Sequence, residues 1–331
     1  MRIVIDAMGG DNAPEEILKG TVKAVNDLND ITCIVTGKSN KINSLLKNFS
    51  YNKEKIEVVN AEQEVTMMDK PSDVLRKKKD SSLIVGTNLV SDKKADAFIS
   101  AGNTGAVMAA GIFKVGRIKN VKRPPIATVF PSKLGKTLVL DAGANVDSKP
   151  QHLIQFALMG QIYASEVLNI NNPRVGLLSI GEEKEKGNKL NTETYELIEN
   201  NNIMDNFIGN VEGRDIFNGN CDVVVCDGFV GNIVLKTTEG VASYVFDLLK
   251  EALNDNLKSK IGALLLKDQL KAMKAKLDYR KYGGAPLLGL QAPVIISHGS
   301  SDEQAIYSAI KVAREAILNN VVAKIEEKIE K

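Results

Sequence analysis

The chain has 331 residues, and its 44% hydrophobic and 25% charged content is typical of a globular protein with a full core and excludes an intrinsically disordered chain. Its 43 basic and 41 acidic side chains leave a net charge of +2, which excludes a strong overall field for nucleic acid. We therefore expect no nucleic-acid partner, and any basic docking surface must be a local patch.

Apolar, strand-like runs recur along nearly the whole chain. They are continuously apolar rather than alternating, which is typical of strands that are covered on both faces. In chain order the predicted strands are Ile3–Ile5, Ile31–Val35, Ile56–Val59, Ala97–Ile99, Ile126–Phe130, Thr137–Leu140, Val175–Ile180, Asp222–Cys226 and Pro293–Ser297.

Helical patterns lie between these strands, and two of them have clear start signals. Asn12, Pro14 and Glu15 predict the start of the first helix: a cap, a proline in the first turn and an acid that bonds back to the cap. Ser301 and Gln304 predict a capping box before the last helical pattern, whose apolar face contains Ile306, Ala309, Ile310, Ala313 and Ile317. Strand–helix alternation predicts an α/β fold with a doubly wound, mostly parallel sheet. Because no linker interrupts it, we expect residues 1–331 to form a single unit.

One segment departs from this alternation. Lys250–Tyr279 carries helical patterns and no strand, and it contains the apolar run Ile261–Leu266. Lys258–Lys281 holds seven Lys, one Arg and two Asp, a local net charge of +6. We expect an inserted helical hairpin over residues 250–281 that is basic with an apolar tip, although two docked helices would have the same pattern.

Six strand-like runs end in polar turns rich in Gly, Asn and Asp. These turns begin at Asp6, Ser100, Asp141, Ser179, Asp227 and Ser297. The carboxyl ends of parallel strands share one sheet edge, so we expect the six turns to converge on one pocket. Each turn alone would be ordinary turn chemistry. Together they predict an anion site, because glycine lets the backbone approach a ligand and free amides at helix starts bind anions.

Several other chemistries lack their motifs. The dinucleotide pattern G-x-G-x-x-G, the P-loop and the nucleophile elbow G-x-S-x-G are absent. Cys33, Cys221 and Cys226 have no metal-like spacing, so we expect buried thiols. The strand-end aspartates, Asp6 and Asp227 among them, are expected to fix turns rather than bind a metal, and we expect no metal site. A site of neutral donors without a covalent nucleophile suits a reaction in which a bound anion attacks.

The amino-terminal residues and the hydropathy indicate the expected cellular location of the protein. The strand-like run Arg2–Asp6, which contains the first predicted strand, leaves no room for a signal peptide. No apolar run approaches the roughly 20 residues that span a bilayer. We therefore expect a cytoplasmic protein.

Five of these turns and two further strings resemble the PlsX family of bacterial phosphate acyltransferases. The similarity runs in order from residue 1 to about residue 318, with small departures at Ser179 and Gln291–Ala292. The strings that carry it are Asp6–Asp11, Ser100–Ala106, Asp141–Asp147, Ile180–Asn188, Gly209–Asp215, Asp227–Asn232 and Tyr282–Gly289.

This resemblance implies a three-layer αβα fold related to phosphotransacetylase and isopropylmalate dehydrogenase. It implies a reversible reaction in which acyl-[acyl carrier protein] and orthophosphate give acyl phosphate and free carrier protein, without metal or organic cofactor. It also implies a homodimer that works with a membrane glycerol-3-phosphate acyltransferase in phospholipid synthesis.

We expect phosphate to lie on the turn that follows the fourth predicted strand. The candidate phosphate-binding residues are Ser100, Asn103, Thr104, Gly105 and Asn145, and the candidate catalytic residues are Asn103, Lys186, Asn232 and His298. The thioester carbonyl is expected to point at backbone amides around Gly9 and Gly10, as in an oxyanion hole.

The carrier protein is acidic, so its docking surface should be basic. Arg76–Lys79 is one candidate. The other is the basic segment, with Lys258, Lys260, Leu264, Leu265, Leu266, Lys267, Lys271 and Lys274. Basic residues around exposed leucines also suit an anionic membrane surface, so we expect peripheral membrane association. The alternative is that the apolar tip packs across a dimer interface or over the acyl site.

Three other functions remain open from the sequence. An acyl-coenzyme A phosphotransacetylase would share the chemistry without a docking patch. A metal-dependent hydroxy-acid dehydrogenase on a related fold would need a dinucleotide site. A non-catalytic acyl-carrier or lipid-binding scaffold would consume no phosphate.

Overall fold

The computed structural model describes residues 1–277 and 283–330, except for the side chains of residues 272 and 274–277. Its strands form two sheets. The first has the order β10 (Ala285–Pro286), β11 (Val294–Ile296), β4 (Ala97–Ser100), β1 (Arg2–Asp6), β2 (Thr32–Gly37) and β3 (Ile56–Asn60). The second has the order β5 (Ala127–Ser132), β6 (Gly135–Leu140), β9 (Val223–Val225), β7 (Val175–Leu178) and β8 (Phe207–Val211).

Neighbouring strands are parallel except in the pairs β10–β11 and β5–β6. The predicted mostly parallel α/β fold is therefore confirmed. The expectation that all six polar turns share one sheet edge is wrong. The turns after β1, β4 and β11 belong to the first sheet, and those after β6, β7 and β9 belong to the second.

Helices cover both faces of the first sheet. Alternation along β1 decides which residue faces which layer. Ile3 and Ile5 pack in a core with α1 (Glu15–Asp27), α2 (Ser39–Leu46) and α12 (Glu303–Leu318). Val4 packs on the opposite face with α3 (Pro71–Lys77), α4 (Ser82–Ser91) and α5 (Thr104–Ala110). A 3-10 turn, η1 (Lys53–Lys55), precedes β3, and a π-helical turn, η2 (Gly111–Val115), follows α5.

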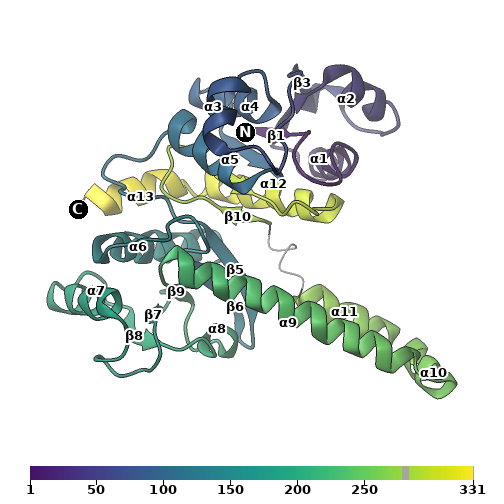
Figure 1. Ribbon diagram of the computed structural model, residues 1–331. Helices are drawn as coiled ribbons and strands as arrows, with labels where there is room; N and C mark the ends of the chain where they lie inside the picture. Colours follow the sequence, from purple (N-terminus) through teal and green to yellow (C-terminus); the bar gives the residue numbers. More distant parts are fainter. Residues whose placement is uncertain (278–282, 331) are drawn as a thin grey trace.

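The second sheet is also covered on both faces. Leu138 and Leu140 of β6 pack with α6 (Pro150–Glu166) and α13 (Val321–Glu330), and α7 (Lys189–Asn200) closes the edge of this core. Val139 faces the other way, toward α8 (Asp215–Asn218) and the start of α9 (Gly228–Asn254). In Figure 1, α12 and α13 lie between the two sheets. The sheets and their helices form the layered arrangement expected of the αβα fold.

The segment Lys250–Tyr279, predicted to be helical without a strand, is helical over its described residues 250–277 apart from short breaks at 255–256 and 266. The long helix α9 projects away from the sheets, α10 (Leu257–Leu265) lies at its far end, and α11 (Lys267–Leu277) runs back beside it (Figure 1). The described part is therefore a helical hairpin. In the described ranges no helix combines the length and the apolarity that crossing a bilayer requires.

The predicted caps of two helices are wrong. Pro14 occupies the cap position of α1, and its side chain has no polar atom that could cap the helix. The side chain of Asn12, the predicted cap, instead donates to the carbonyl oxygen of Ser301 at 3.3 Å. At α12 the cap is Asp302, whose carboxylate accepts from the Ala305 amide at 2.9 Å. The Ser301 hydroxyl does not cap the helix and donates to the carbonyl oxygen of His298 at 2.6 Å. The apolar face predicted for α12 packs in the core of the first sheet.

Two strands, β8 and β10, were not predicted from the sequence. β8 contains Gly209 with φ +87° and a half-exposed Ile208, so it lacks the continuous apolar pattern of the central strands. β10 has only 2 residues and contains Pro286, which cannot donate to a ladder and is tolerated at a sheet edge.

Candidate active site

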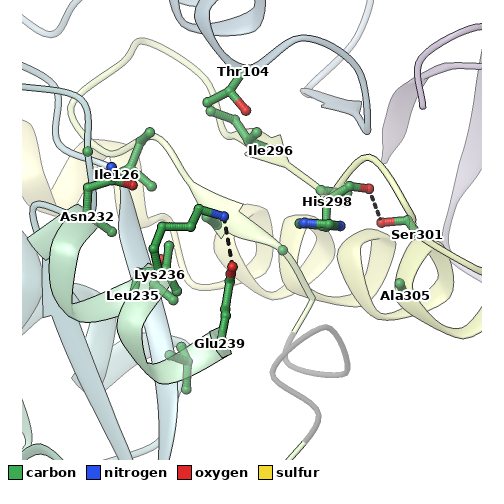
Figure 2. Close-up of a pocket in the computed structure, with 17 residues that line it drawn as sticks. Thr104, Ile126, Asn232, Leu235, Lys236, Glu239, Ile296, His298, Ser301 and Ala305 are labelled. Carbon is green, nitrogen blue, oxygen red and sulfur yellow. Dashed lines mark hydrogen bonds and ion pairs between the residues drawn. The ribbon is translucent and has the colours of Figure 1, made fainter. Parts of the chain in front are cut away.

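A cavity of about 220 Å³ lies where the two sheets face each other. Residues from both halves line it, and Figure 2 shows Thr104 and His298 on one side and Asn232, Lys236 and Glu239 on the other. The apolar part of the lining consists of Ile126, Val129, Ala142, Leu235, Ala285, Ile296 and Ala305. The cavity therefore combines a few polar groups with an apolar wall, which is the usual composition of a small-molecule site.

A hydrogen bond between side chains joins the turn after β1 to the turn after β4. The buried Asp6 carboxylate accepts from the Ser100 hydroxyl at 2.7 Å and from the Met8 amide at 3.1 Å. Burial raises the pKa of Asp6, and the hydrogen bonds from Ser82 and Ser100 oppose that rise. A Cβ on Gly9 would lie 2.8 Å from both Asp6 Oδ2 and Gly102 N, so only glycine fits there. The turn-fixing role expected for Asp6 is confirmed.

Asn103 lies outside the cavity lining and supports it through hydrogen bonds. Its side-chain oxygen caps α5 by accepting from the Ala106 amide at 3.0 Å. Its amide nitrogen lies 3.1–3.2 Å from the carbonyl oxygens of Thr66, Met67 and Asp69. The Asn103 side chain thus ties the start of α5 to the loop 66–69, and the next residue, Thr104, lines the cavity.

The turn after β6 is organised by Asp141. This fully buried carboxylate accepts from the amides of Ile126, Gly143, Ala144 and Asn145 and from the Asn145 side chain, at 2.6–3.1 Å. Burial raises the pKa of Asp141, while these hydrogen bonds lower it. The Asn145 side chain is therefore engaged in the turn, and Gly143 reaches the cavity.

The start of α9 rests on this turn. The Gly228 amide donates to the Asn145 carbonyl oxygen at 2.8 Å, and a Cβ on Gly231 would lie 1.9 Å from the Asp141 carbonyl oxygen. Asp227 caps the helix by accepting from the amides of Phe229 and Val230, which confirms its expected turn-fixing role. The close approach brings the first turns of α9 against the cavity.

Three residues of α9 present polar groups to the cavity. Asn232, Lys236 and Glu239 are spaced four and three residues apart, so they lie on one helix face. Lys236 Nζ lies 2.8 Å from Glu239 Oε2. More than half of the Lys236 side chain is exposed, so this ion pair contributes at most about 1 kcal/mol to stability. Lys236 nevertheless brings a positive charge to a cavity whose other polar groups are mostly neutral.

The turn after β11 completes the cavity with Ser297, His298 and Ser301. The Ser300 amide donates to His298 Nδ1 at 3.1 Å, and the Ser300 hydroxyl oxygen lies 2.8 Å from the same atom. A backbone N–H can only donate, so Nδ1 is an acceptor and the neutral ring carries its hydrogen on Nε2.

The structure brings three of the predicted site residues together in the cavity lining: Thr104, Asn232 and His298. The others lie outside it, and most of them build the turns that support it. They are Gly9, Gly10, Ser100, Asn103, Gly105 and Asn145. Lys186 is exposed in the loop after β7, where its carbonyl oxygen accepts from the Ser179 hydroxyl at 2.9 Å.

Sequence reasoning did not assign roles to Glu239, Gly284 or Ser297, which also line the cavity. Glu239 could have been found from its helical spacing to Asn232 and Lys236. Gly284 follows the hairpin in sequence, and no local pattern indicates that it lies at the cavity.

Comparisons with known proteins agree on a family. A family model described as fatty acid synthesis protein matches residues 1–324. A phosphate acyltransferase from Halothermothrix orenii is 58% identical over 331 residues, covering 100% of this chain and 99% of the relative. One from Dictyoglomus turgidum is 48% identical over 332 residues, covering 100% and 98%.

Solved structures with a similar fold have much lower sequence identity. A phosphotransacetylase from Streptococcus pyogenes superposes with a TM-score of 0.66 at 17% identity, over 96% of this chain and 94% of the other. A branched-chain phosphotransacylase from Enterococcus faecalis has a TM-score of 0.57 at 15% identity, over 95% and 99%. At these identities the likeness shows the fold alone, and that fold is the one expected from the family resemblance.

Proposed function

This chain belongs to the fatty acid synthesis protein family of phosphate acyltransferases and is an acyltransferase; we propose that it transfers the acyl group of an acyl-[acyl carrier protein] to orthophosphate. The acyl phosphate formed would feed the acylation of glycerol 3-phosphate by a membrane acyltransferase in phospholipid synthesis. The observation that carries the proposal is the cavity between the sheets, with Lys236 opposite His298.

The size and polarity of the cavity suit the reacting groups. A cavity of about 220 Å³ has room for phosphate and a thioester group. Lys236 would attract the phosphate dianion, with Thr104, Asn232 and His298 as further donors. Ser100, Asn103, Gly105 and Asn145 would support phosphate binding through the turns that they hold together.

Direct attack by phosphate needs no covalent enzyme intermediate. A phosphate oxygen bonds to the carbonyl carbon, the carbon–sulfur bond breaks, and its electron pair leaves with the thiolate, which is then protonated. The three cysteines are buried, and burial raises the pKa of Cys33 and Cys221 to about 12. None of them lines the cavity, so no thiol is placed to compete with phosphate as the nucleophile.

One mixture tests this function. Purified protein, acyl-carrier protein and radiolabelled phosphate should form a labelled lipid that hydroxylamine destroys, since hydroxylamine cleaves acyl phosphates. The absence of this product would refute the proposed reaction. A parallel mixture with acyl-coenzyme A separates it from the alternative, a phosphotransacetylase, which would prefer that donor.

The hairpin formed by α9, α10 and α11 is the proposed docking element. The exposed apolar residues at its tip, in and next to α10, are Leu257, Ile261, Leu264, Leu265 and Leu266, and they lie beside Lys258, Lys260, Lys267 and Lys271. The Lys274 side chain lies outside the described residues. We propose that this tip contacts an anionic membrane surface or the acidic carrier protein, giving a peripherally associated cytoplasmic enzyme.

The second candidate docking patch, Arg76–Lys79, is partly engaged within the protein. Lys78 forms an ion pair with Asp69 at 2.6 Å, and Lys77 pairs with Asp73 at 3.0 Å. These pairs neutralise half of the patch, so we favour the hairpin. The exposed face of α9 that carries Val241, Tyr244 and Val245 is the surface we propose for a homodimer.

Replacing Leu265 by Asp is expected to weaken binding to anionic vesicles about 10- to 100-fold. The change removes about 1.5–3 kcal/mol of apolar burial and adds a charge repelled by the anionic surface. Vesicle sedimentation measures the effect. Leu134→Asp is the matched control, because Leu134 is 78% exposed against 76% for Leu265 and lies in the β5–β6 turn, far along the chain from the hairpin. Equal binding of both variants and the wild type would exclude the membrane role.

A further inference from the structure

Ser297 places a hydroxyl at the cavity without giving it a partner. Ser297 follows β11 and is 4% exposed. Its Oγ has no hydrogen-bond partner among the residues that the structure describes, although the residue lines the cavity. Burying a hydroxyl without a partner is costly, so nearly all buried polar groups are hydrogen-bonded. An unpaired one at a cavity wall indicates a group that is meant to bind a ligand.

The backbone around Ser297 holds this hydroxyl in place. The Ser297 amide donates to the Ser100 carbonyl oxygen at 2.8 Å, which fixes the residue to the end of β4. Gly284 lies next to this hydroxyl and has a φ of +78°. A Cβ on Gly284 would lie 3.1 Å from Ser297 Oγ. Because glycine occupies this position, no side chain from residue 284 covers the hydroxyl, which a small rotation of the serine side chain would turn toward the cavity.

The surroundings of Ser297 indicate which substrate atom it meets. The neighbouring lining residues Ala285 and Ile296 are apolar, and such surroundings strengthen a hydrogen bond to an atom that gains charge. The cation of the cavity, Lys236, and its ion-pair partner Glu239 both come from α9 on the other side (Figure 2). We therefore expect the phosphate to bind near Lys236, and the acyl carbonyl to lie near the neutral Ser297 hydroxyl among apolar side chains.

We propose that the Ser297 hydroxyl donates a hydrogen bond to the carbonyl oxygen of the acyl substrate. The inference rests on the proposed function. When phosphate attacks, the carbonyl π electrons move to this oxygen, and the hydroxyl stabilises the charge without giving up its proton. The charge returns to re-form the carbonyl as the carbon–sulfur bond breaks. Ser297 thereby takes the oxyanion role that the sequence suggested for Gly9 and Gly10, whose backbone lies outside the cavity lining.

Ser297→Ala separates this role from a structural one. Turnover should fall about 100-fold, as when one oxyanion donor is removed. The melting temperature should stay the same or rise, because the variant removes an unsatisfied buried hydroxyl. Ser308→Ala is the matched control, since Ser308 is also buried but its hydroxyl accepts from Gln304 on α12. Unchanged turnover in Ser297→Ala, or a lowered melting temperature, would overturn the proposal.

A binding experiment keeps the test independent of turnover. The probes are a long-chain β-ketophosphonate, in which CH₂ replaces the bridging oxygen of an acyl phosphate, and the alkylphosphonate of equal length, which lacks the carbonyl. Calorimetry should show that Ser297→Ala weakens the ketophosphonate about 10-fold and leaves the alkylphosphonate unchanged. Equal weakening of both would place Ser297 at the phosphate and overturn the carbonyl assignment. If the wild type forms no acyl phosphate, the proposed function fails, while this comparison still decides whether Ser297 meets a carbonyl.

Discussion

Replacing Asp141 by Ala is expected to lower the free energy of unfolding by about 4 kcal/mol or more. The carboxylate accepts from four backbone amides and one side-chain amide while it is 0% exposed. Each buried donor left without a partner costs about 1–3 kcal/mol, and water can reach only some of them. Urea unfolding followed by circular dichroism measures the loss.

Two further variants make this result specific. Asp141→Asn keeps one side-chain oxygen as an acceptor but turns an NH₂ group toward backbone donors. It should lower the free energy of unfolding measurably, but by less than Asp141→Ala does. Asp147→Ala is the control, because Asp147 is exposed in the same turn. Its effect should stay within about 0.5 kcal/mol. A loss in Asp141→Ala no larger than that of Asp147→Ala would contradict the anchoring role.

The stability of this turn also bears on the cavity. α9 starts on it through the bond from Gly228 to Asn145, and Gly231 leaves no space between helix and turn. Asn232 and Lys236 follow directly on that helix. A change that loosens the turn should therefore displace the polar wall of the cavity, and misplacement by about 1 Å can cost about 100-fold in rate.

Local sequence patterns were sufficient for the central strands, though not for β8 and β10, and for the turns that bear polar residues. Continuous apolar runs predicted β1, β2, β4 and β6, because strands that are buried on both faces need no polar alternation. The turn-fixing roles of Asp6 and Asp227 also followed from local chemistry, since a carboxylate after a strand is placed to accept from the amides of the next turn.

Long-range arrangement was not predictable from those patterns. β11 joins β4 although about 200 residues separate them in sequence, and nothing near Val294 indicates that pairing. The division of the strands into two sheets gives the polar turns two different roles. Some turns line the cavity between the sheets, and others, such as the turn at Ser100, hold neighbouring turns in place through hydrogen bonds. Ser297 was passed over because its unpaired hydroxyl is visible only in three dimensions.

Asn103 shows how a residue can matter to the site without touching its ligand. The sequence predicted a phosphate ligand here, and the structure engages both ends of the side chain in the protein. The loop that Asn103 holds brings Met67 Cε to 2.9 Å from where a Cβ on Gly299 would lie, next to His298. We propose that Asn103 is a positioning residue for this side of the cavity.

Asn103→Ala is accordingly expected to lower turnover about 100-fold, through displacement of the loop and of Thr104. Loss of the helix cap should cost about 1 kcal/mol of stability at the same time. Asn103→Asp separates the two effects, because the carboxylate would still accept from the Ala106 amide but could not donate to the three loop carbonyls. Steady-state assays should show both variants similarly slow, and only Asn103→Ala should lose the contribution of the helix cap.

Controls decide between a loop anchor, a phosphate ligand and no role. Asn52→Ala removes another side-chain cap, on η1, and should leave turnover unchanged. A phosphate ligand would raise the KM for phosphate in Asn103→Asp far more than it lowers turnover, since the new carboxylate would repel the dianion. A loop anchor lowers turnover and leaves that KM within about 2-fold, because its effect is on geometry. Wild-type turnover in both variants would remove Asn103 from the site, because neither the cap nor the three loop bonds would then matter to the reaction.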